Sequence, residues 1–190
     1  MHSISDILNI ILESIFMGFG IVIPIFVLAM RSSNLKAIAF KELFILTAVQ
    51  TVRIAGILYF VLWLVHSWEQ YNDPVVTGGM PFKDKLFGPY WPVYLFSPLM
   101  KFVLSQLFWI KKIYIKKAAL ITFALLLAIL PAQRVVVFIA SLATKDYLPS
   151  AWTLSTRDTI VEIALNIVVF IFIIIPILLG SGKLKKVLEK

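Results

Sequence analysis

Five long apolar runs, separated by shorter polar segments, dominate the pattern of this chain. The runs cover residues 7–30, 42–66, 90–110, 118–142 and 159–179. Each is close to the roughly 20 residues that a helix needs to cross the hydrocarbon core of a bilayer. Because backbone groups inside lipid must be hydrogen-bonded within their own segment, we expect five transmembrane helices. The pattern predicts an all-α integral membrane protein, with residues 1–190 forming one domain and one helical bundle.

The charges of the polar segments predict the orientation of this bundle. In a chain with five spans, the segments after the first and third runs and the C-terminal tail all fall on one side. All three segments are basic, and the other two connecting segments carry balanced charge. Their basic residues are Arg31, Lys36, Lys41, Lys111, Lys112, Lys116, Lys117, Lys183, Lys185, Lys186 and Lys190. Because basic loops stay on the cytoplasmic side, we expect the N-terminus outside and the C-terminus inside.

The amino-acid composition excludes several kinds of covalent bond, cofactor site and partner. Hydrophobic residues make up 61% of the chain, against about 45–50% in soluble domains. The absence of cysteine excludes disulfides, cysteine-ligated iron–sulfur centres and thiol chemistry within this chain. The two histidines, His2 and His66, do not form the facing pair that a buried haem requires. The net charge of +8 is explained by the basic loops, so we expect no nucleic-acid partner.

Several polar residues lie inside the apolar runs. A charge at the centre of a bilayer costs roughly 2.5–3.5 kcal/mol on insertion scales, so such residues usually face a bundle interior or a polar path. We therefore take them as candidates for an intramembrane polar or proton path: Glu13, Gln50, Arg53, Lys101, Gln106, Gln133, Arg134 and Glu162. The sequence shows no metal-ligand spacing and no nucleophile–base constellation, so we predict no metal site and no catalytic residue.

Three interpretations of the buried cations remain open. Arg53 and Lys101 lie near the middle of their runs, where a long side chain reaches the interface only with difficulty. The first interpretation is that these side chains reach the interface in this way. The second is a buried structural ion pair, and the third is a functional polar path. Candidate ion pairs are Arg134 with Glu162 and Arg53 with Glu13, since both carboxylates lie toward the outer ends of their runs.

Two stretches carry a resemblance to a known family. "FGPYWPVYLFSPLMKFVLSQLFWIKK" begins at Phe87, and "QRVVVFIASLATKDYLPSAW" follows after a short apolar segment. In this order and spacing they resemble the NrfD-like (polysulfide-reductase-like) membrane subunits, most closely that of alternative complex III, a bacterial quinol-oxidising complex. Members of that family have eight to ten spans in two four-helix bundles, and the present motifs resemble the second bundle.

The resemblance implies a membrane subunit of a quinone-linked respiratory electron-transfer complex in the bacterial inner membrane. Such a subunit has a structural or proton-path role and binds no cofactor of its own. Its expected partners are lipid, other membrane subunits, and outer-face iron–sulfur or haem c subunits that carry the redox centres. Quinone or quinol belongs to the complex. Two positions depart from the family pattern: Gln133 replaces a glutamate, and Lys101 replaces a residue that tends to be asparagine. Both departures weaken the expectation that this chain conducts protons by the family's route.

Two further functions and one further site remain open from the sequence. The chain could be a small membrane scaffold or assembly protein derived from that family, or an anion-handling transporter protomer whose midplane cations bind a solute. Catalysis is therefore uncertain, and a non-catalytic role within a quinol oxidoreductase complex is the leading interpretation. Residues at the outer mouth of the bundle could line a quinone site: Tyr90, Trp91, Arg134, Asp158 and Glu162.

Overall fold

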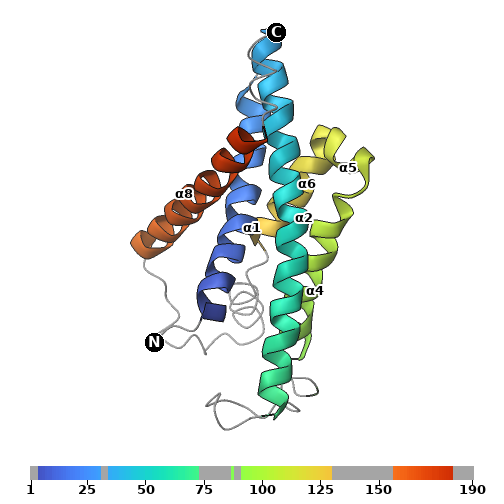
Figure 1. Cartoon of the computed structure of the whole chain (residues 1–190), viewed down its shortest axis with the longest axis vertical. Helices are drawn as coiled ribbons and strands as arrows, with labels where there is room; N and C mark the ends of the chain where they lie inside the picture. The colour runs from blue at the N-terminus through green and yellow to red at the C-terminus, as the bar shows by residue number, and fades with distance from the viewer. Residues whose placement is uncertain (1–3, 31–33, 73–86, 88–90, 130–155, 182–190) are drawn as a thin grey trace.

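The regular secondary structure is helical throughout the part of the chain that is described. The computed structural model describes residues 4–30, 34–72, 87, 91–129 and 156–181. Figure 1 shows the arrangement of the helices in these residues. They are α1 (Ile4–Ala29), α2 (Leu35–Asn72), α4 (Trp91–Leu107), α5 (Lys111–Ile115), α6 (Lys117–Ile129) and α8 (Thr156–Gly180). The predicted all-α class therefore holds for the described residues.

Three helices have the length and the apolar composition needed to cross a membrane: α1, α2 and the Ile160–Gly180 part of α8. They contain nearly all of the first, second and fifth predicted runs. The helix α2 extends beyond the second run, 42–66, at both ends. At 1.5 Å per residue the 38 residues of α2 extend about 57 Å, well beyond the ~30 Å hydrocarbon core.

The third and fourth predicted runs correspond to shorter helices. Residues 90–110 give α4, which ends at Leu107, and the start of 118–142 gives α6, which is described as far as Ile129. The remainder of the fourth run lies outside the described residues. Five membrane crossings therefore stay a prediction, of which three are supported by helix length and composition.

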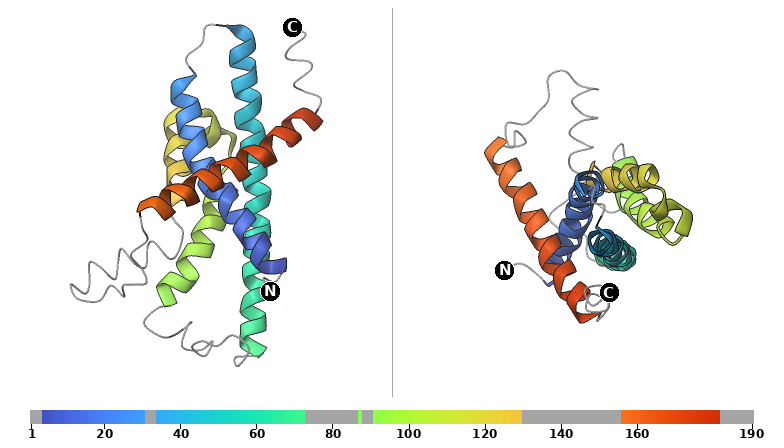
Figure 2. Two further views of the ribbon diagram at one scale, coloured as in Figure 1. Left: turned by 90° about the vertical axis from the view of Figure 1, so that its left-hand side faces the viewer. Right: turned by 90° about the horizontal axis from the view of Figure 1, so that it is seen from above.

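α1 is the central helix of the bundle. It contacts α2, α6 and α8, while α4 packs mainly against α2. Figure 2 shows α8 lying obliquely across α1. Large apolar side chains of α1 form the middle of the core, among them Phe16, Phe19 and Ile23. The ring of Phe19 makes edge contacts with Phe108 near the end of α4 and with Phe170 of α8.

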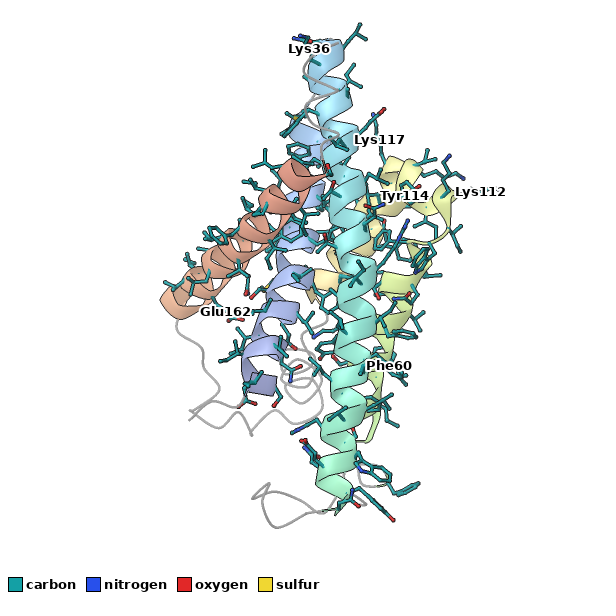
Figure 3. All side chains as sticks on the ribbon, in the orientation of Figure 1. Lys36, Phe60, Lys112, Tyr114, Lys117 and Glu162 are labelled. Carbon is teal, nitrogen blue, oxygen red and sulfur yellow. The ribbon has the colours of Figure 1, made fainter. Side chains whose placement is uncertain are left out.

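Two of the three basic segments have described residues, and these lie toward one end of the bundle. Figure 3 shows Lys36, Lys112 and Lys117 in the upper part of the view, above Glu162 and Phe60. The segments after the first and third runs thus lie toward the same end of the described structure, and the C-terminal tail lies outside the described residues. Which side of a membrane this end faces remains a prediction.

Two glycines of α1 allow neighbouring helices to approach closely. A Cβ atom on Gly18 would overlap the side chain of Phe170 and the carbonyl oxygen of Asn166 on α8. A Cβ atom on Gly20 would overlap Ala128 and the carbonyl of Ala124 on α6. Small residues at such positions are typical of membrane helix packing, because they let backbones come together. Gly18 and Gly20 thus permit close helix packing on two sides of α1.

Gly18→Val is expected to lower the free energy of unfolding by about 1–3 kcal/mol, because overpacking at a tight helix contact forces backbone shifts. Gly180→Val is the matched control, since no atom lies within 4 Å of an added Cβ there. Thermal unfolding of detergent-solubilised protein, followed by circular dichroism, measures both. Equal midpoints for the two variants would contradict the close contact between α1 and α8.

Candidate functional site

The side chain of Lys101 lies at the centre of a polar cluster inside the bundle. Lys101 is on α4 and only 2% of its surface is exposed. Its Nζ atom lies 2.8 Å from Oε1 of Glu13 on α1 and donates a hydrogen bond at 3.3 Å to the hydroxyl of Tyr59 on α2. The Tyr59 hydroxyl in turn lies 3.4 Å from Glu13 Oε1. One cation thus connects three helices.

Aromatic rings complete the surroundings of this ammonium group. Nζ of Lys101 lies 4.6 Å from the ring centroid of Tyr59 and 5.9 Å from that of Phe16. The two rings meet edge to face, with centroids 5.6 Å apart. The face of an aromatic ring attracts a cation. The rings therefore supplement the counter-charge of Glu13.

The two members of the ion pair differ strongly in burial. Half of the Glu13 side chain is exposed (49%), whereas Lys101 is covered almost completely. An unpaired charge without solvent is far more costly than one that can be solvated. Removing the carboxylate of Glu13 is therefore expected to destabilise the cluster more than removing the ammonium group of Lys101.

A pocket of about 250 Å³ adjoins this cluster. Its polar lining comes from α1, α4 and α8, and its apolar lining from α1 and α6. The lining residues are Ile10, Glu13, Phe16, Met17, Lys101, Leu127, Glu162 and Asn166. Glu162 and Asn166 are four residues apart on α8 and so share one face of that helix. The pocket brings a second carboxylate to the Lys101–Glu13 pair.

Hydrogen bonds between α1 and α8 support the pocket wall. The hydroxyl of Ser14 donates to Oδ1 of Asn166 at 2.7 Å. The amide nitrogen of Asn166 lies 2.9 Å from the sulfur of Met17. These contacts fix the side chain of Asn166 beside the pocket, and they lie next to the close approach of α8 at Gly18.

Arg53 forms a separate cluster and does not pair with Glu13. The predicted Arg53–Glu13 pair is wrong, because the partner of Glu13 is Lys101. The guanidinium group of Arg53 donates to the carbonyl oxygen of Phe108, just beyond the end of α4. Its Cζ atom lies 4.8 Å from the ring centroid of Trp109 and 5.3 Å from that of Tyr114. A cation at a helix C-terminus interacts favourably with the free carbonyls and the helix dipole.

Gln106 secures the same contact between α2 and α4. Its amide nitrogen donates to the backbone carbonyl of Arg53 at 3.1 Å, and its Oε1 accepts from the indole nitrogen of Trp109 at 2.8 Å. Nε of Arg53 is buried and has no hydrogen-bond partner among the described residues. The charge of Arg53 is thus compensated by a carbonyl and two rings, with no carboxylate among these contacts.

The structure brings together three of the predicted path residues and separates others. Glu13, Lys101 and Glu162 meet at the pocket, whereas Arg53 and Gln106 form the second cluster. Gln50 is exposed on α2 and belongs to neither cluster. The remaining predicted residues lie outside the described part of the chain, either wholly (Tyr90, Gln133 and Arg134) or in their side chains (Trp91 and Asp158). The Arg134–Glu162 pair and the quinone mouth therefore stay predictions.

Sequence reasoning missed several residues of these clusters. Ser14 adjoins Glu13, and Asn166 follows Glu162 by one helical turn, so their polarity within apolar runs was a usable signal. Tyr59 gave no such signal, because a single tyrosine in an apolar run is usually counted with the apolar residues. Its role follows only from the packing of α2 against α1 and α4.

No family model, curated protein or solved structure matches this chain. In the described part of the chain, no group of three or more His, Cys, Asp or Glu residues is placed to hold a metal ion. Within that part, the arrangement holds the charge of Lys101 against the carboxylate of Glu13, and Glu162 lines the same pocket.

Glu13→Gln is expected to destabilise the bundle more than Lys101→Met. The first change leaves a buried ammonium group unpaired, at a cost of about 3–5 kcal/mol, whereas the second leaves a half-exposed carboxylate. The double variant should recover much of the loss. Free energies of unfolding for the wild type, both single variants and the double variant form the cycle. Strictly additive losses would mean that the two side chains do not interact.

Arg53→Lys is expected to loosen the end of α4 although it keeps the positive charge. An ammonium group cannot reproduce the planar stacking on Trp109 and Tyr114, and the loss is about 1–2 kcal/mol. Hydrogen exchange followed by mass spectrometry should show faster exchange in peptides covering residues 107–115. Lys36→Arg, at the exposed start of α2, is the control. Unchanged exchange in Arg53→Lys would rule out the proposed role of the guanidinium plane.

Proposed function

We propose that this chain is a membrane subunit of a quinone-linked respiratory electron-transfer complex in the bacterial inner membrane, corresponding to half of an NrfD-like protein. It contributes an intramembrane polar cluster with a structural or proton-path role. Iron–sulfur or haem c centres belong to partner subunits at the outer face. In this proposal the chain spans the membrane five times, with its N-terminus outside.

The observation that carries this proposal is the meeting of titratable groups at one pocket. Lys101, Glu13 and Tyr59 come from three helices and lie within hydrogen-bonding or near hydrogen-bonding distance of one another. Glu162 of a fourth helix lines the same pocket. Ionisable residues that face a bundle interior commonly mark proton relays and ion pathways. The resemblance of the α4 segment to NrfD-like subunits supplies the respiratory context.

The pocket itself is better suited to protons and water than to a quinone. A quinone carbonyl needs hydrogen-bond donors, and the strongest donor of the lining, Lys101, directs two of its three N–H groups to Glu13 and Tyr59. The other charged groups of the lining are the carboxyl groups of Glu13 and Glu162. We therefore place no quinone in this pocket, and no step of the proposal passes through one.

A membrane scaffold or assembly protein is the second candidate. The contacts of Arg53 favour it, because its hydrogen bond and ring contacts join α2 to residues 108–114, just beyond α4 and in α5. A scaffold would use Lys101 in the same way, as a connection between helices. An anion transporter is less well supported, since a solute would have to displace the existing partners of both cations.

Purification of the tagged native protein from its own membranes separates the candidates. The respiratory proposal predicts co-purification with iron–sulfur or haem c subunits and quinol oxidation by the isolated complex. A chain that runs alone, with no redox subunit and no response to quinol, would contradict it.

Glu162→Gln then distinguishes a proton path from a structural role. This change leaves the Lys101–Glu13 ion pair in place, so the complex should assemble normally. A proton path through the pocket predicts slower proton release coupled to quinol oxidation, with Glu69→Gln at the far end of α2 as the matched control. Normal assembly together with unchanged proton release would leave Glu162 without a proton-path role.

A further inference from the structure

The turn between α4 and α6 combines exposed apolar and basic side chains. We call residues 109–117 the basic turn. Its apolar members are well exposed: Trp109 by 62%, Ile110 by 50% and Ile115 by 60%. Its four lysines, at positions 111, 112, 116 and 117, are exposed as well. A surface that is both apolar and cationic is typical of a segment lying in the interface of a membrane.

The basic turn lies near the level at which α1 ends. Lys117 is close enough to Lys41 for their like charges to repel. The ammonium group of Lys41 in turn donates to the carbonyl oxygens of Val27 and Met30, at 2.8 and 2.9 Å, where α1 ends at Ala29. Free carbonyls at a helix end need such partners or water. The basic turn is thus placed where the apolar part of the bundle gives way to a polar region.

No acidic residue offsets the charge of the basic turn. The sequence from Leu107 to Ile129 contains no Asp or Glu. None of the four lysines pairs with a carboxylate of the described residues. Four cations within seven residues therefore repel one another and also repel Lys41. An anionic partner would relieve this repulsion, and the exposed lysines are free to meet it.

The basic turn is held in shape from within the bundle. Arg53 contacts Phe108, Trp109 and Tyr114, and Gln106 bonds the indole of Trp109. These contacts fix the direction of α5 before any partner arrives. A preformed surface loses less conformational entropy on binding than a flexible one.

We propose that the basic turn is a binding site for the phosphate headgroups of anionic phospholipids. α5 lies along the membrane surface, with Trp109, Ile110 and Ile115 in the boundary between headgroups and acyl chains. The four lysines bind lipid phosphates through their ammonium groups. Each lysine near an anionic membrane surface contributes attraction, and a tryptophan is favoured at headgroup level. This inference does not depend on the proposed respiratory role.

Native mass spectrometry of the full chain tests the proposal, with micelles containing equal amounts of phosphatidylglycerol and phosphatidylcholine. The wild type should retain more phosphatidylglycerol than phosphatidylcholine. Changing lysines 111, 112, 116 and 117 to glutamine should reduce that preference at least about tenfold. The matched control changes lysines 183, 185, 186 and 190 of the tail to glutamine, which removes the same net charge and should leave most of the preference.

Three other outcomes of this experiment would contradict the proposed lipid-binding site. Equal loss in both quadruple variants would make the preference an effect of net charge alone, and no loss in the turn variant would exclude the basic turn. Displacement of the lipid by inorganic phosphate at millimolar concentration would identify free phosphate as the ligand. If circular dichroism shows that the turn variant is unfolded, Lys112→Gln and Lys116→Gln replace it. Each should then lower retention measurably, and unchanged retention in both would overturn the proposal.

Discussion

The ammonium group of Lys101 is buried inside an apolar bundle, and the packing of three helices around it depends on the carboxylate of Glu13. The pair spans 2.8 Å between α4 and α1, and Tyr59 of α2 completes the contact. A buried cation without a counter-charge costs more than most single packing contacts provide. Any arrangement of α1, α2 and α4 that separated these groups would therefore be strongly disfavoured.

The other cations near the bundle interior are compensated in a different way. Arg53 donates to the carbonyl of Phe108 beyond α4, and Lys41 donates to two carbonyls at the end of α1. Both use the free carbonyls at helix C-termini, where a positive charge also interacts favourably with the helix dipole. The lysines of the basic turn have no such partner among the described residues, which is why they are left to bind an external anion. Cations with a carbonyl or carboxylate partner among the described residues thus stabilise the bundle, whereas the lysines of the basic turn remain available for binding.

The apolar runs predicted the helical class and the three long helices correctly, because a run of about 20 apolar residues has few alternatives to a helix in lipid. They also identified Lys101, Glu13 and Glu162 as members of a polar site. They did not predict that Glu13 pairs with Lys101 and not with Arg53. The choice between Arg53 and Lys101 for Glu13 depends on the rotation of α2 and α4 about their axes. That rotation is set by close contacts such as Gly56 against Ser105, which periodicity alone does not show.

The contact between Lys101 and Glu13 can be measured directly by magic-angle-spinning NMR of the protein in lipid bilayers. The chain would carry ¹⁵N at lysine Nζ and ¹³C at glutamate Cδ. Our account predicts a strong dipolar coupling between a lysine Nζ and a glutamate Cδ that disappears in Glu13→Gln. The absence of such a coupling in the wild type, or its persistence in Glu13→Gln, would contradict the ion pair on which the account rests.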